Sequence, residues 1–177
     1  MGLKDFVQTR RDNAELGQGV WRRAHDRFRR GLDRFHQILE RVEEGPLLEA
    51  LVPAANRLAD LLPQVREVAA AAQRLAPSES TDIPASPDGR YSELHRTLSK
   101  AGNAVAQCAE ALAMLRCGGA CPAAGCSTAE SVERRITAVE EQILEAKRLL
   151  RIAETPAAAA HEPPHPASRS LHSVRRG

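Results

Sequence analysis

Large apolar residues recur at every seventh position through residues 21–42. The fourth position of each heptad holds a small or apolar residue instead. The two sets are, in order, Trp21, Phe28, Phe35 and Val42, and then Ala24, Gly31 and Ile38. Apolar first and fourth places are typical of a helix that packs along a seam. The repeat therefore predicts a helix over residues 20–44 and specifies its inner face.

Three further stretches, residues 47–75, 91–115 and 129–153, keep the same spacing of apolar residues. Gly45 and Pro46 separate the first two helices, since glycine commonly ends a helix and proline begins one. Pro53 and Pro63 fall off the seam of residues 47–75, so they indicate bends, with a helix break as the alternative. The capping box that begins at Ser127 predicts the start of the last helix. Together these patterns predict an all-α chain whose residues 20–155 form an antiparallel four-helix bundle with coiled-coil-like packing.

Both ends of the chain depart from the repeat. Residues 1–19 place Arg10 and Gly17 at core positions, which predicts a short N-terminal helical extension joined to the main helix by a bend. Leu3, Phe6 and Val7 give this extension some apolar character, so a membrane-surface anchor is an alternative to docking on the bundle. The Pro-, Ala- and His-rich residues 156–177 predict a disordered tail.

The bundle prediction also assigns burial to individual residues. Six seam residues are expected in the core: Trp21, Phe28, Leu98, Val105, Ile136 and Ile143. Four charged residues off the seam are expected to be exposed: Arg23, Arg30, Glu133 and Glu140. His25, His36 and His95 also fall off the seam, and we expect them on helix surfaces.

Arginine is concentrated in the first helix of the predicted bundle. Residues 20–36 hold six arginines and two aspartates. Spacing of three or four residues allows pairs such as Arg22 with Asp26, so a solvated and largely self-paired face is the main expectation. The alternative is a weak nucleic-acid or anionic-membrane binder whose basic face is formed by Arg22, Arg23, Arg29 and Arg30.

Three cysteines lie close together between the last two predicted helices. Cys117, Cys121 and Cys126 are separated by four and five positions, with glycines between them. Three interpretations stay open: free thiols in a surface loop, a labile disulfide, and a site for a soft metal such as zinc or copper. Cys108 falls at a core position of the preceding helix and is expected to be buried.

Composition and motifs bear on function mainly by exclusion. The net charge of +2 is too small to indicate an anionic partner by itself. The longest apolar run is far shorter than a membrane span, which favours a cytoplasmic protein. No phosphate loop, nucleophile elbow or zinc-protease signature is present. We therefore expect a non-enzymatic protein without a cofactor that binds an unknown protein partner or forms a homo-oligomer.

Overall fold

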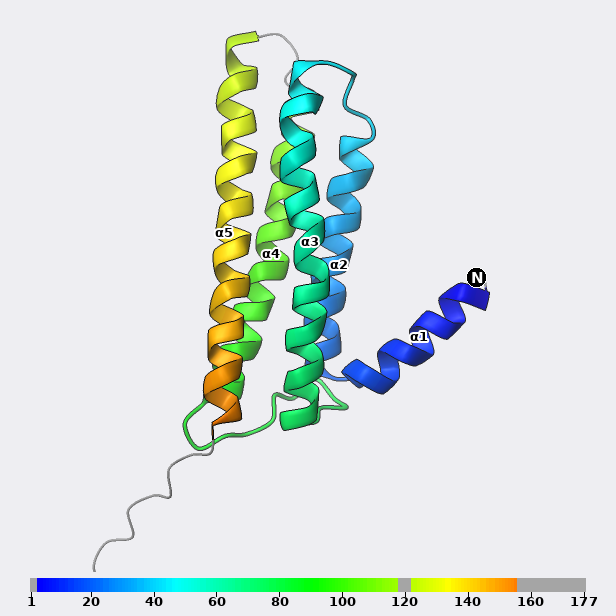
Figure 1. Ribbon diagram of the computed structural model, residues 1–177, viewed down its shortest axis with the longest axis vertical. Coiled ribbons are helices and arrows are strands. Elements are labelled where there is room, and N and C mark those ends of the chain that lie inside the picture. The colour runs from blue at the N-terminus through cyan, green and yellow to red at the C-terminus, as the bar shows by residue number, and fades with distance from the viewer. Residues whose placement is uncertain (1–2, 118–121, 156–177) are drawn as a thin grey trace, which may run out of the picture.

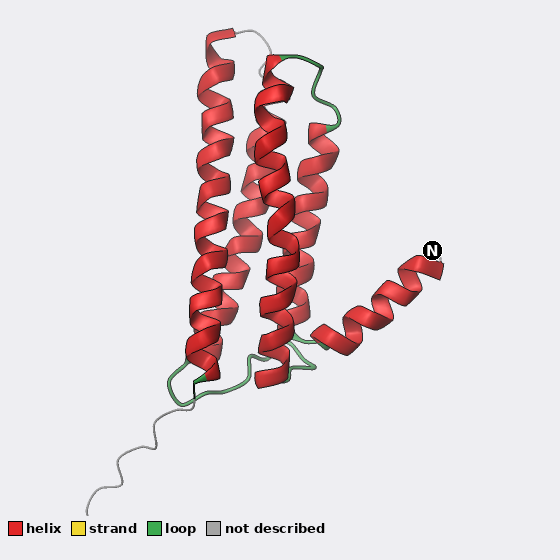
Figure 2. Ribbon diagram, in the orientation of Figure 1, coloured by secondary structure: helices red, strands yellow, loops and turns green. Residues whose placement is uncertain are grey.

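A computed structural model describes residues 3–117 and 122–155, with side chains described for 10–114 and 129–155. Its five helices are α1 (Leu3–Leu16), α2 (Val20–Leu39), α3 (Pro46–Leu75), α4 (Arg90–Cys117) and α5 (Pro122–Glu154). Helices and loops account for the whole described part, which contains no strand, so the predicted all-α class is confirmed there (Figure 2). Within the same residues, no helix combines the length and apolar character needed to cross a membrane.

Helices α2 to α5 lie side by side, and α1 projects from one end of them (Figure 1). Helix α2 packs against α3 and α4, and α5 packs against the same two helices. This packing is consistent with a helical bundle. The core follows the predicted seam, because all six residues expected in it are at most 1% exposed: Trp21, Phe28, Leu98, Val105, Ile136 and Ile143.

Two glycines let α2 and α4 approach closely. A Cβ atom added to Gly31 would lie 3.0 Å from Cγ1 of Val105 and 3.2 Å from the backbone nitrogen of Ala106. On the other helix, a Cβ added to Gly102 would lie 3.1 Å from Cγ of Arg27. The small residue that the heptad placed at position 31 thus faces the backbone of a neighbouring helix.

The structure corrects two predicted helix ends. Helix α2 ends at Leu39 and not at Glu44. The amides of Arg41 and Val42 bond to carbonyls three residues back, which tightens the chain into a turn before Gly45. Helix α5 begins at Pro122, well before the capping box at Ser127, because proline suits the first position of a helix and alanines follow it.

Helix α3 continues through both of its internal prolines. Pro53 and Pro63 lie inside the helix and are exposed, so the prediction that neither ends it is confirmed. Arg57 of the same helix bonds to Glu133 at 2.6 Å and to Glu140 at 2.9 Å. These two glutamates of α5 were expected to be exposed and are instead partly covered, because they tie α5 to α3.

The connection between α1 and α2 is short and tightly held. Gly17 has a φ of +64°, which a glycine adopts without strain, and it turns the chain between the helices. The amide of Gly19 donates to the carbonyl of Ser78 at 2.9 Å, and the indole of Trp21 donates to the carbonyl of Ala76 at 2.8 Å. The start of α2 is therefore fixed to the segment that follows α3.

Candidate functional site

The arginines predicted to form one basic face lie on two faces of α2. The side chain of Arg22 is 13% exposed and that of Arg29 is 40% exposed, and both form ion pairs. Arg23 and Arg30 are exposed. Positions seven apart share a helix face, so 22 pairs with 29 and 23 with 30. The first pair is turned toward Asp12 of α1 and the second pair toward solvent, and binding of nucleic acid or an anionic membrane by these arginines stays a prediction.

A buried carboxylate is the centre of the first face. Asp12 of α1 is 1% exposed. Arg66 of α3 donates to it at 2.5 Å, and the guanidinium groups of Arg22 and Arg29 lie 3.7 and 3.9 Å from it. A buried charge is tolerated when opposite charges and hydrogen bonds surround it, so this cluster attaches the base of α1 to α2 and α3.

Glu15 extends the same cluster toward solvent. It accepts a hydrogen bond from Arg66 at 2.7 Å and another from Arg11 at 2.9 Å. The bond from Arg11, and next the bond from Arg66, lowers the pKa of the Glu15 carboxyl. Burial opposes the charge of Arg66, but its bonds to Asp12 and Glu15 outweigh this and raise its pKa. These are the features of a structural ion-pair cluster, because each acid accepts hydrogen bonds from arginine.

His25 lies beside this cluster and corrects another expectation. It was expected on a helix surface, yet it is 3% exposed. Burial lowers its pKa, although its hydrogen bond with Asp26 at 3.2 Å acts in the opposite direction. His95 is half-buried with its ring 6.1 Å from that of Trp21, and burial lowers its pKa too.

The second face of α2 carries four exposed arginines in one line, which we call the arginine stripe. Spacings of four, three and four residues keep its members on one side of the helix: Arg23, Arg27, Arg30 and Arg34. None of the ion pairs formed between described residues involves any of them. The stripe is about 16 Å long, from 1.5 Å per residue.

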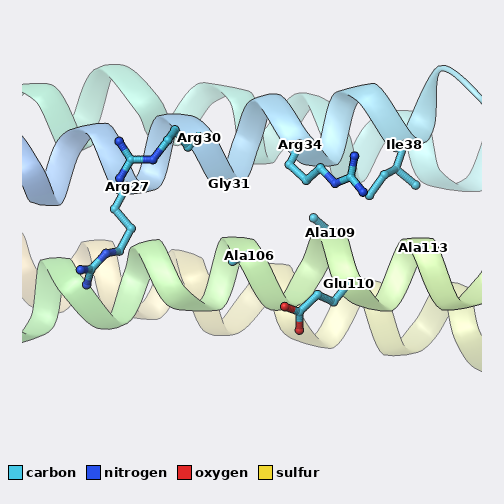
Figure 3. Close-up of a pocket in the computed structure, with 9 residues that line it drawn as sticks. All are labelled: Arg27, Arg30, Gly31, Arg34, Ile38, Ala106, Ala109, Glu110 and Ala113. Atoms are coloured by element: carbon cyan, nitrogen blue, oxygen red, sulfur yellow. The ribbon is translucent and has the colours of Figure 1, made fainter.

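A groove of about 480 Å³ runs between the arginine stripe and α4 (Figure 3). Helix α2 supplies one wall and α4 the other. The lining residues are Arg27, Arg30, Gly31, Arg34 and Ile38 of α2 and Ala106, Ala109, Glu110 and Ala113 of α4. Figure 3 shows Arg27 reaching across to α4, while the Glu110 carboxylate points away from α2. The site therefore combines one basic edge with a lining rich in glycine and alanine.

A second hollow, of about 360 Å³, lies where α4 begins and α5 ends. Arg90 crosses it and donates to the carbonyls of Ile152 and Thr155 at 3.3 and 2.8 Å. The same guanidinium bonds to Asp88 at 2.6 Å, which lowers the pKa of that carboxyl to about 2. Because these polar groups already bind one another, this hollow joins helix ends.

The predicted cysteine site falls mostly beyond what the structure describes. Cys121 lies outside the described residues, and Cys117 and Cys126 belong to α4 and α5 without described side chains. The zinc or copper interpretation stays a prediction. Within the described ranges, no three His, Cys, Asp or Glu side chains gather as metal ligands do. Cys108 is fully buried as predicted, and burial raises the pKa of its thiol to about 11.

Sequence reasoning missed Asp12, Arg66 and the role of Arg27 and Arg34. The spacing of Arg23, Arg27, Arg30 and Arg34 is present in the sequence. The heptad repeat, however, relates only residues seven positions apart and therefore does not join all four. Asp12 and Arg66 are 54 residues apart, and no local pattern joins them. No protein-family model, no curated protein and no solved structure matches the chain.

Proposed function

We propose that this chain is a non-enzymatic cytoplasmic protein that binds another protein, or a second copy of itself, through α1. The observation that carries the proposal is the position of that helix. Helix α1 extends away from the other four, and its base is attached by the cluster around Asp12 (Figure 1). In this proposal residues 20–155 form an antiparallel four-helix bundle that presents residues 1–19 as a helical extension.

The physics of short helices supports a partner for α1. Helix α1 is 14 residues long, and isolated helices shorter than about 12–15 residues are marginal in water. Most helical stability in proteins comes from packing of an apolar face, and the backbone of α1 projects away from the other four helices (Figure 1). Its sequence supplies Leu3, Phe6 and Val7 for such packing. A fixed base combined with a free end suits a docking element.

The test replaces apolar residues of α1 in the full chain. Phe6→Glu with Val7→Glu is compared with Gln8→Glu and Thr9→Glu, which make the same substitution type in the same helix. Light scattering of the purified chain measures self-association, and cross-linked capture from the native cell measures bound protein. Phe6→Glu with Val7→Glu should lower either self-association or the amount of captured protein by about tenfold. Gln8→Glu with Thr9→Glu should leave both quantities unchanged. Equal binding by wild type and both variants would show that α1 is not the docking element.

A further inference from the structure

The groove between α2 and α4 has room for the close approach of another helix. Its lining includes Gly31 on α2 and alanines at positions 106, 109 and 113 of α4 (Figure 3). Small side chains bring the surface of a groove near the helix backbones, so the ridge of a third helix can lie between them at an ordinary interaxial distance of about 8–10 Å.

The charge along this groove is strongly one-sided. Three members of the arginine stripe, Arg27, Arg30 and Arg34, line its α2 edge. None of the ion pairs between described side chains includes Arg30 or Arg34. Two acids lie nearby. Glu110 lines the α4 wall with its carboxylate turned away from α2 (Figure 3). Asp33 is exposed on α2. A ligand that lies against the stripe therefore meets mainly guanidinium groups, which bind carboxylates well because of their paired donors.

The geometry points to a docking site for an acidic amphipathic helix of a partner protein in the groove between α2 and α4. The stripe repeats every three or four residues, and carboxylates on one face of an α-helix repeat at the same interval. A helix lying along the groove would thus meet successive arginines with successive acids over about three turns. Its small and apolar residues would pack on the alanines of α4.

Nucleic acid fits the same surface less well. The aromatic residues of α2, Trp21, Phe28 and Phe35, are all fully buried and offer no surface for base stacking. Phosphates gain nothing from the alanines of α4. A helical partner uses both halves of the groove, the basic edge and the small residues.

This inference is independent of the proposed role of α1, because the stripe and α1 lie on different faces of α2. The probe is a synthetic helical peptide of about five turns, with glutamates at spacings of four, three and four residues and alanine and leucine beside them. A second peptide of equal composition has its glutamates spread around the helix. Fluorescence anisotropy of each labelled peptide is measured with the full chain at about 0.1 M salt.

Charge variants locate the binding surface. Arg30→Glu with Arg34→Glu should weaken binding of the first peptide by about tenfold. Arg134→Glu with Arg151→Glu changes the net charge equally at exposed positions of α5 and should change binding less than about twofold. Arg23→Glu with Arg27→Glu tests the other half of the stripe and should act like the first pair. Thermal unfolding followed by circular dichroism confirms that the compared variants are folded.

A neutral variant separates the groove from charge alone. Ala106→Gln fills the groove without changing charge and should weaken the first peptide by about tenfold as well. Equal binding of the two peptides, an unaffected Ala106→Gln variant, or equal losses in the α5 control would each overturn the inference. So would tighter binding of a duplex DNA of about 20 base pairs, lost with the same arginines, or a homodimer that Arg30→Glu with Arg34→Glu dissociates.

Discussion

Phe28 is fully buried, whereas Arg27 is exposed beside it in sequence. This contrast between adjacent residues is what a helix with one packed face requires. Phe28→Ala should reduce the free energy of unfolding by about 3–5 kcal/mol, from lost burial and a residual cavity. Urea denaturation measures it, and Arg23→Ala, at an exposed position, should cost less than about 0.5 kcal/mol. A loss below about 1 kcal/mol at Phe28 would contradict its place in the core.

His25 predicts how stability depends on pH. Burial lowers its pKa in the folded chain below the usual 6.5. As pH falls through 6.5, the unfolded chain therefore binds a proton at His25 that the folded chain binds only at lower pH. Its contribution is fully present above that value and decreases on acidification. The melting temperature should fall between about pH 7.5 and about pH 5.5.

His25→Gln is the test of this dependence, and it should remove about half or more of the fall in melting temperature. The dependence that remains belongs first to His95, because burial lowers its pKa as well. Measuring above about pH 5 keeps Glu15 charged, since its lowered pKa makes it titrate in more acidic solution. An unchanged fall in the variant would show that the pKa of His25 is the same in the folded and the unfolded chain.

The positions of single residues could be predicted from the sequence where a repeat applies to them. All six seam residues named for the core are buried, because the heptad identifies one face without knowledge of the partner helix. The seam residue Val42 is half-buried, because α2 ends before it. His25 could not be placed correctly, since it lies off the seam and is buried beside a cluster that includes α1 and α3. Burial of Asp12 depends on Arg66, whose approach is a property of the folded chain alone.

Among contacts between helices, the approach of α2 to α4 predicts the effect of a single methyl group. Gly31→Ala gains about 1 kcal/mol of helix propensity. The added Cβ would lie 3.0 Å from the Val105 side chain and 3.2 Å from the backbone of Ala106, and backbone cannot move aside cheaply. Overpacking costs about 1–3 kcal/mol, so the variant should unfold more easily in urea than the wild type. A Gly31→Ala variant that is more stable than the wild type would mean that α2 and α4 lie farther apart than these distances indicate.

The buried carboxylate of Asp12 is the centre of the cluster at the base of α1. Asp12→Asn keeps the shape of the side chain but removes the charge that Arg66, Arg22 and Arg29 surround. The loss should be about 1–3 kcal/mol and should act mainly on α1, because the cluster is at its base. Amide hydrogen exchange of Leu3–Leu16 should then become about ten times faster or more while the centre of α4 keeps its protection.

Asp33→Asn is the matched control for this exchange measurement. Asp33 is an exposed aspartate of α2, and no ion pair between described residues includes it. It should leave exchange in α1 unchanged. Equal protection of α1 in Asp12→Asn and the wild type would contradict the role of the cluster.

Whole helices were more predictable than their ends or their surfaces. Apolar periodicity placed all four long helices, because a regular seam extends over many turns. The end of α2 at Leu39 and the start of α5 at Pro122 differ from the predicted positions. A tight turn ends α2, and a proline that is favourable in the first turn begins α5. The groove between α2 and α4 could not be predicted, because it depends on which helices become neighbours. Which helices become neighbours is determined by the packing of the complete chain.

At the scale of the whole molecule, α4 contacts both α2 and α5, so opening its buried face disrupts two helix pairs. Cys108 lies on that face and is fully buried. The raised pKa of about 11 lowers the thiolate fraction at neutral pH about a hundredfold below that of an ordinary thiol. A reagent that needs the exposed thiolate therefore reaches Cys108 when the bundle opens, which makes this thiol a probe of global unfolding.

A chain in which Cys117, Cys121 and Cys126 are replaced by serine leaves Cys108 as its one thiol. Iodoacetamide should label it very slowly in buffer, and the rate should rise with urea along the same curve as unfolding followed by circular dichroism. Asn103→Cys in this background adds an exposed thiol on the same helix and should be labelled at once. If Cys108 reacts in buffer as fast as that control, α4 separates from its neighbours without global unfolding, and the packing described for α2, α4 and α5 is not cooperative.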